Sequence, residues 1–94
     1  MTDLELLEEC KIGLGIETTE TSFNGILTQK LKAVKSYMIG AGVSTAMLED
    51  DLSVNTIVLG VSDLWNISSG DAKFSMIFTQ SVIQLTGRSL TVEV

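Results

Sequence analysis

The sequence predicts an all-α fold: a small bundle of about four helices with a long second helix and an extended C-terminal tail. Apolar residues recur every three or four positions through most of the chain, which is the period of a helix with one buried face. The 94 residues contain no proline, so glycines and short polar runs separate the segments. This length suits one domain, spanning residues 1–94.

The first helix is expected to begin after Thr2, because Thr2 and Glu5 stand in capping-box positions. Its broad apolar face is formed by Leu4, Leu6, Leu7, Cys10 and Leu14. Gly13 and Gly15 are expected to end this helix, and residues 16–21 to form a polar loop.

A long second helix over residues 23–39, capped by Thr21 or Ser22, is expected to be the spine of the domain. Its core face is formed by Phe23, Leu27, Leu31, Val34, Met38 and Ala41, and is widened by Ile26 and Tyr37. Two glycines then stop the helix. Lys30 falls on the apolar side of this helix. Either its aliphatic chain packs there while the ammonium group reaches solvent, or the residue contacts a neighbouring subunit.

A third helix is expected over residues 51–66, after a connection of undefined shape at 43–50. Its core face comprises Val54, Ile57, Val58, Val61, Leu64 and Trp65, of which Trp65 should be buried between helices. Three leucines share the opposite side, namely Leu48, Leu52 and Leu59. Their alignment predicts a second contact surface, unless the connection folds Leu48 back into the core.

The fourth helix is expected over residues 75–86, after a turn within 66–73. One side carries Phe74, Phe78, Val82 and Leu85, and the nearly opposite side carries Met76 and Ile83. A short helix that is apolar on two sides is covered on two sides, by its own domain or by another copy of the chain. Residues 89–94 alternate like a β-strand, so this tail should pair elsewhere or stay disordered.

Composition disfavours several classes of function. Twelve acidic residues against six basic ones give a net charge of −6, which suits neither a phosphate backbone nor an anionic membrane. The chain has no histidine and no glycine-rich phosphate loop, and the acidic run 49–51 lacks the spacing of a calcium loop. We therefore expect no catalytic activity, no cofactor and no metal, with Cys10 serving as a small hydrophobic residue.

The apolar content points to a partner. Hydrophobic residues make up 45% of the chain and the mean hydropathy is +0.36, which is more apolar material than so small a core readily hides. The acidic start lacks a signal-peptide pattern, and no apolar run is long enough to span a membrane. We expect a soluble, intracellular product when it is made.

Two groups of short motifs carry a resemblance to a known family. The first is Leu7-x-x-Cys10-Lys11-x-x-Leu14-Gly15-Ile16, followed by a polar acidic loop and a long helix with Ile26, Leu27 and Ala33. The second is Trp65-Asn66, a turn at Gly70, and a last helix closing on Gln84-Leu85-Thr86-Gly87-Arg88. In this order they resemble the QLRG (DNA-packaging) family of bacteriophage head–tail connector, or adaptor, proteins. Thr86 replaces the arginine of the family's Gln-Leu-Arg-Gly motif, and Arg88 follows two residues later.

The resemblance implies a structural role in the virion. Such a connector forms a cyclic homo-oligomer that docks beneath the phage portal protein after DNA packaging and links the capsid to a stopper or tail-completion protein. It would be made in the host cytoplasm and end at the head–tail interface, with DNA passing through its lumen without specific binding. Ring subunits meet head to tail, so each needs two unlike contact surfaces. The candidate interface residues are Leu48, Leu52 and Leu59 on one side, and Met76 and Ile83 on the other.

A different class of function also fits the composition: a small intracellular helical regulatory protein that binds a protein partner as a dimer. A large cyclic assembly would favour the connector, and a compact dimer would favour the regulator. A helix-turn-helix DNA-binding protein is disfavoured by the net negative charge.

Overall fold

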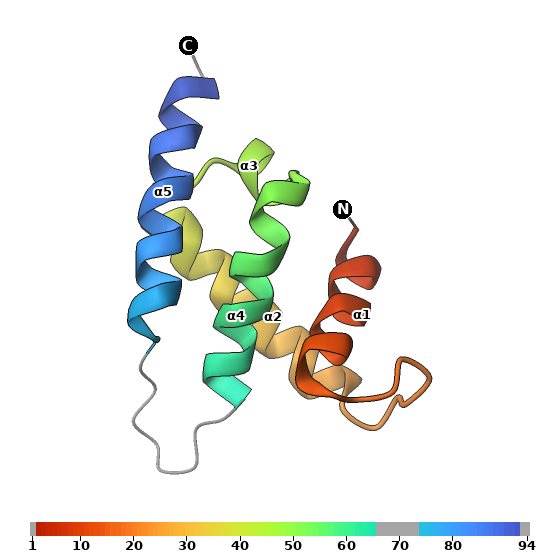
Figure 1. Cartoon of the computed structure of the whole chain (residues 1–94). Helices are drawn as coiled ribbons and strands as arrows, with labels where there is room; N and C mark the ends of the chain where they lie inside the picture. The colour runs from red at the N-terminus through yellow and green to blue at the C-terminus, as the bar shows by residue number, and fades with distance from the viewer. Residues whose placement is uncertain (1, 66–73, 93–94) are drawn as a thin grey trace.

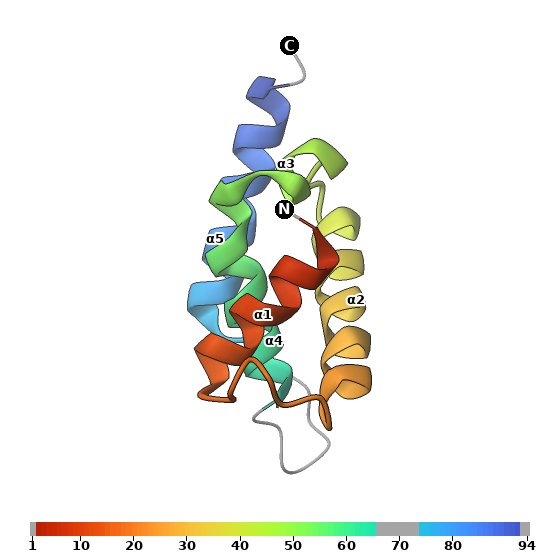
Figure 2. The ribbon, with the colours of Figure 1, turned by 90° about the vertical axis from the view of Figure 1, so that its right-hand side faces the viewer.

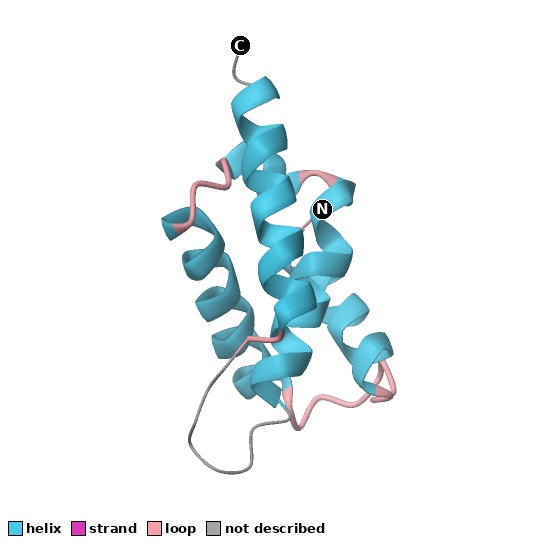
Figure 3. Cartoon of the chain, turned by 60° about the vertical axis from the view of Figure 1, so that its left-hand side comes forward, coloured by secondary structure: helices cyan, strands magenta, loops and turns pink. Residues whose placement is uncertain are grey.

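The computed structural model describes residues 2–65 and 74–92, and every regular element among them is a helix (Figures 1 and 3). The helices are α1 (Asp3–Leu14), α2 (Asn24–Gly40), α3 (Thr45–Glu49), the 3-10 helix η1 (Asp51–Ser53), α4 (Val54–Trp65) and α5 (Met76–Val92). The all-α prediction is confirmed. Four of the helices match the four predicted ones. Helix α3 lies within the connection of undefined shape, and η1 takes the first three residues of the predicted helix 51–66.

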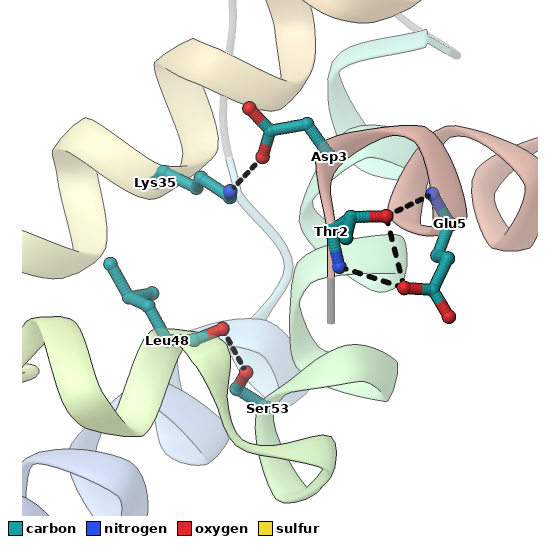
Figure 4. A network of polar contacts seen from close by, with 6 residues as sticks. All are labelled: Thr2, Asp3, Glu5, Lys35, Leu48 and Ser53. Atoms are coloured by element: carbon teal, nitrogen blue, oxygen red, sulfur yellow. Dashed lines mark hydrogen bonds and ion pairs between the residues drawn. The ribbon is translucent and has the colours of Figure 1, made fainter.

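The predicted capping box is present at the start of α1. The Thr2 hydroxyl accepts the Glu5 backbone N–H at 3.2 Å, and the Glu5 carboxylate accepts the Thr2 backbone N–H at 3.0 Å (Figure 4). Gly15 ends the helix with a φ of 74°, as expected of a left-handed cap. Gly13, however, lies inside α1, where an added Cβ would stand 2.7 Å from Val58 Cγ1. Its role is to let α1 approach α4, so the prediction that it stops the helix is wrong.

Helix α2 is the spine that the sequence predicts, with four side chains buried in the core: Leu27, Leu31, Val34 and Met38. Its start differs from the prediction. Phe23 occupies the cap position without a side-chain hydrogen bond, because its phenyl ring has no group that could accept one. The Ser22 backbone N–H instead donates to the Glu20 carboxylate. Phe23, Ile26, Tyr37 and Ala41 were expected on the core face but are exposed.

The connection between α2 and α4 folds Leu48 back into the core. Ser44 begins α3 by accepting the Met47 backbone N–H at 3.1 Å. Ser53 then donates its hydroxyl to the Leu48 carbonyl at 2.9 Å, which closes the turn (Figure 4). Leu48 is 7% exposed, and Leu59 is partly buried against the core. The predicted stripe of leucines is therefore wrong, because η1 separates α3 from α4 and the three residues do not lie on one continuous helix.

Helix α5 continues six residues beyond its predicted end at residue 86. The expectation of a strand-like tail is thus wrong for residues 89–92, and residues 93–94 lie outside the described part. The buried Ser89 hydroxyl donates to the Leu85 carbonyl at 2.8 Å and accepts the Ser44 backbone N–H at 3.0 Å. This contact joins the end of α5 to Ser44 at the start of α3. The local sequence does not reveal it.

Glycine also governs the centre of the bundle. An added Cβ at Gly60 would lie 2.5 Å from Phe78 Cε1 and 2.9 Å from Val34 Cγ1. The missing side chain thus lets α2, α4 and α5 meet at one point. Trp65 is only partly buried and packs edge-on against Phe23, with ring centroids 5.4 Å apart. The prediction that Trp65 is buried between helices is thus confirmed in part.

The arrangement leaves two helices at opposite edges. Helix α4 packs on both α1 and α5, and α2 crosses the bundle beside them (Figures 1 and 2). Helices α1 and α5 run in opposite directions, so the start of α1 and the end of α5 lie toward the same end of the molecule (Figure 1). This geometry positions the exposed surfaces of the chain.

Candidate subunit interface

The outer side of α5 exposes apolar side chains, uncharged polar side chains and one cation, Arg88. Met76 is 76% exposed and Ile83 is 65% exposed, and Ile77 is exposed beside them. We call six exposed side chains of this helix the α5 face: Met76, Ile77, Gln80, Ile83, Gln84 and Arg88. The opposite side of the same helix buries Phe78, Val82 and Leu85 in the core.

Contacts at the start of α5 hold this face in place. The Asp63 carboxylate of α4 accepts the Ser75 backbone N–H at 2.9 Å, and Ser75 in turn accepts the Phe78 backbone N–H at 3.2 Å. The rings of Phe74 and Phe78 stack with centroids 4.4 Å apart. The outer side of α5 is therefore presented by a helix whose orientation is set by polar and aromatic contacts.

The outer side of α1 exposes a second apolar surface, which sequence reasoning missed. Leu4 is 68% exposed and Ile12 is 62% exposed, with exposed Glu8 midway between them. We call these three residues the α1 stripe. Their spacing of four residues places them on one helix face, and that spacing could have revealed the stripe.

A lysine shares the buried face of α1, which the sequence did not predict. Lys11 is 3% exposed and donates its ammonium group to the Thr18 carbonyl at 3.3 Å. The buried face is thus centred on Leu6, Leu7, Cys10 and Lys11. Leu4, in the first turn, lies outside this face, so its predicted place in the core is wrong.

The predicted interface residues divide into two groups. Met76 and Ile83 lie together on the α5 face, as their spacing indicates. Leu52 is exposed in η1, but Leu48 is in the core and Leu59 is partly buried against it. Lys30, the other residue considered for a subunit contact, donates instead to the Leu64 carbonyl at 3.4 Å, near the C-terminus of α4. That position is favourable for a cation.

Charge is segregated between the two edges of the bundle. Residues 3–20 contain six carboxylates: Asp3, Glu5, Glu8, Glu9, Glu17 and Glu20. Residues 76–92, which form α5, contain no acidic residue and one basic residue, Arg88. The α1 edge is therefore acidic, and the α5 edge is neutral to weakly basic.

The local environment shifts three titratable groups of α1. A hydrogen bond from Lys35, and then its charge, hold the pKa of Asp3 below its ordinary value (Figure 4). Hydrogen bonds from the Thr2 backbone and hydroxyl lower the pKa of Glu5. Burial, aided by the nearby Glu9 charge, raises the pKa of Cys10 to about 11. The acidic residues thus stay ionised at neutral pH, whereas the thiol stays protonated.

The described residues do not gather groups suited to metal chemistry. Across residues 2–65 and 74–92, no three His, Cys, Asp or Glu side chains are placed to share a metal ion. None of the helices in those ranges combines the length and apolar character needed to cross a membrane. Large apolar side chains are exposed on α1 and α5, and also on α2 (Ile26, Tyr37 and Ile39) and in η1 (Leu52).

The chain matches no protein-family model, no curated protein and no solved structure.

Proposed function

We propose that this chain is a structural subunit of a phage head–tail connector: a ring-forming protein, and not an enzyme, that docks under the portal after DNA packaging. The ring would link the capsid to the tail or its stopper. The observation that carries the proposal is the α5 face, where Met76, Ile77 and Ile83 are exposed together on one helix.

Energetics support association through this face. Full burial of one large aliphatic side chain contributes roughly 1.5–3 kcal/mol. Three such side chains on one face can therefore drive a contact once neighbouring subunits are held close together. A platform such as the portal would hold them at high effective concentration, so weak contacts suffice.

The residues that resemble the family motif lie on α5 and face two ways. Leu85 is buried, whereas Gln84 and Arg88, one turn apart, are exposed on the α5 face. Thr86, which stands where the family has arginine, donates its hydroxyl to the Val82 carbonyl at 2.9 Å. A charged contact made by this motif at the surface would therefore be made by Arg88. This residue places a positive charge two residues after the position of the family's arginine.

The net charge of −6 suits a channel through which DNA slides. Duplex DNA carries about one negative charge per 1.7 Å, so an acidic wall offers it no adhesive contact. We therefore propose that DNA passes through the lumen without specific binding.

The test is the native mass of the purified chain, measured alone and with the portal protein. The proposal expects a cyclic assembly in at least the second case. A compact dimer in both cases would favour the alternative, a regulatory protein. A monomer in both cases, with no association with the portal, would overturn the connector function.

A further inference from the structure

We propose that the α1 stripe of one copy docks antiparallel on the α5 face of a second copy, forming a head-to-tail contact. This inference rests on the proposed self-association and names the surfaces that make it. The two surfaces are unlike and lie at opposite edges of the bundle (Figures 1 and 2). Each copy therefore offers one of each, as a ring subunit requires.

The apolar residues of the two surfaces match in spacing. With a rise of 1.5 Å per residue, Leu4 and Ile12 are separated by about 12 Å along α1. Met76 and Ile83 are separated by about 10.5 Å along α5 on the same basis. An antiparallel alignment can thus place Leu4 against Ile83 and Ile12 against Met76.

The polar residues match in the same register. Glu8 lies midway along the α1 stripe, and Gln80 lies about midway between Met76 and Ile83. The alignment sets the Glu8 carboxylate opposite the Gln80 amide, which has N–H groups to donate. No carboxylate of residues 76–92 opposes Glu8, because α5 contains none.

Charge favours the antiparallel direction. A rotation axis along the bundle keeps α1 of one copy opposed in direction to α5 of the next, as within one chain (Figure 1). The acidic start of α1, with exposed Glu5, then lies toward the Arg88 end of α5. In this register the C-terminus of α1 lies beside the N-terminus of α5, so the negative end of one helix dipole meets the positive end of the other.

Cysteine cross-linking tests the contact directly. The chain carrying both Ile12→Cys and Met76→Cys is treated with a mild oxidant, which takes up the two electrons and two protons released by each new disulfide. The expected product is a ladder of covalent multimers, alone or on the portal. The native Cys10 thiol is buried and protonated, so it should not compete.

Three controls define the geometry. Ile12→Cys alone and Met76→Cys alone should give no dimer, because a head-to-tail contact never brings two copies of one residue together. Ile12→Cys paired with Lys32→Cys, on the exposed side of α2, should give no ladder. A dimer from Met76→Cys alone would show an α5–α5 contact and would overturn the inference.

Charge variants test the register without touching the core, because Glu8 and Gln80 are both exposed. Gln80→Glu should raise the subunit concentration needed for half-assembly by about two- to fivefold, the range expected for one exposed charge pair. Glu8→Lys added to Gln80→Glu should restore assembly. Failure of this rescue would show that the two residues do not face each other.

The outcomes separate this inference from the connector proposal. A native-mass ring without the cross-linked ladder would leave the connector standing and refute the α1–α5 contact. A ladder from chains that form open multimers, and no ring even with the portal, would support the contact and refute the connector. Absence of both assembly and cross-linking would refute both.

Discussion

Replacing Gly60 with alanine should destabilise the fold, although alanine is the better helix former. The added Cβ would lie 2.5 Å from Phe78 Cε1 and 2.9 Å from Val34 Cγ1, distances well inside van der Waals contact. Phe78 is fully buried and stacks on Phe74, with ring centroids 4.4 Å apart. The ring therefore cannot move aside without disturbing the packing around it.

Two opposing terms set the magnitude. Overpacking a core by one carbon typically costs about 1–3 kcal/mol, whereas glycine-to-alanine within a helix returns about 0.8–1.0 kcal/mol. The 2.5 Å approach to Phe78 places the cost in the upper half of its range, so we expect a net loss of about 1–2 kcal/mol in the free energy of unfolding. For a domain of this size that lowers Tm by roughly 4–16 °C, taking about 4–8 °C for each kcal/mol.

Urea unfolding, followed by circular dichroism and by the fluorescence of the chain's one tryptophan, measures the change. Gly87→Ala in α5 is the matched control, because nothing lies within 4 Å of a Cβ added there. That variant should gain up to about 1 kcal/mol from helix propensity. Equal stabilisation by both substitutions would refute the close approach of α4 and α5 at Gly60.

Three further predictions concern α1 and the exposed faces. Ile83→Glu should leave the fold intact and weaken assembly, because Ile83 is exposed. Leu59→Glu should lower the stability of the fold, because Leu59 packs against the core. Thermal melts measure the stability, and native mass measures the assembly. The fold lowers the pKa values of Asp3 and Glu5, so their ionised forms stabilise the folded state. This contribution is fully present above the unfolded-state pKa values, about 4, and is lost as pH falls through the folded-state values. Unfolding curves between pH 6 and pH 2 should show this loss, and Lys35→Met should remove the Asp3 part of it. Cys10 should resist a thiol reagent at about pH 8 in the native state and react fully in urea, since burial raises its pKa to about 11; rapid native labelling would contradict its burial.

Local rules account for the helices that the sequence predicts well. Thr2 and Glu5 form the expected capping box, and the four core residues of α2 follow the helical period. The pairing of Met76 with Ile83 on one exposed face also follows from a spacing of seven residues within a single unbroken helix. These predictions depend only on neighbours within a turn or two, so the sequence contains the necessary information.

Errors arise where a hydrogen bond between residues five or seven positions apart overrides the hydrophobic spacing. Spacing arguments placed Leu48 with Leu52 and Leu59, but the Ser53 bond to the Leu48 carbonyl closes a turn between two separate helices. Lys11 is buried although it is charged, because its ammonium group donates to the Thr18 carbonyl. In both cases the position of a side chain depends on a hydrogen bond rather than on hydrophobic spacing.

By itself, the sequence determined the all-α class, the caps of α1, the spine formed by α2 and the exposed pair on α5, because each depends on short-range periodicity or capping. Only the tertiary structure decided that Gly13 and Gly60 are packing positions and that Leu48 belongs to the core. It also decided that residues 89–92 continue α5, anchored by the bond between Ser44 and Ser89. The physical reason is that close packing and buried hydrogen bonds join residues far apart in the chain, and these pairings have no signature in local spacing.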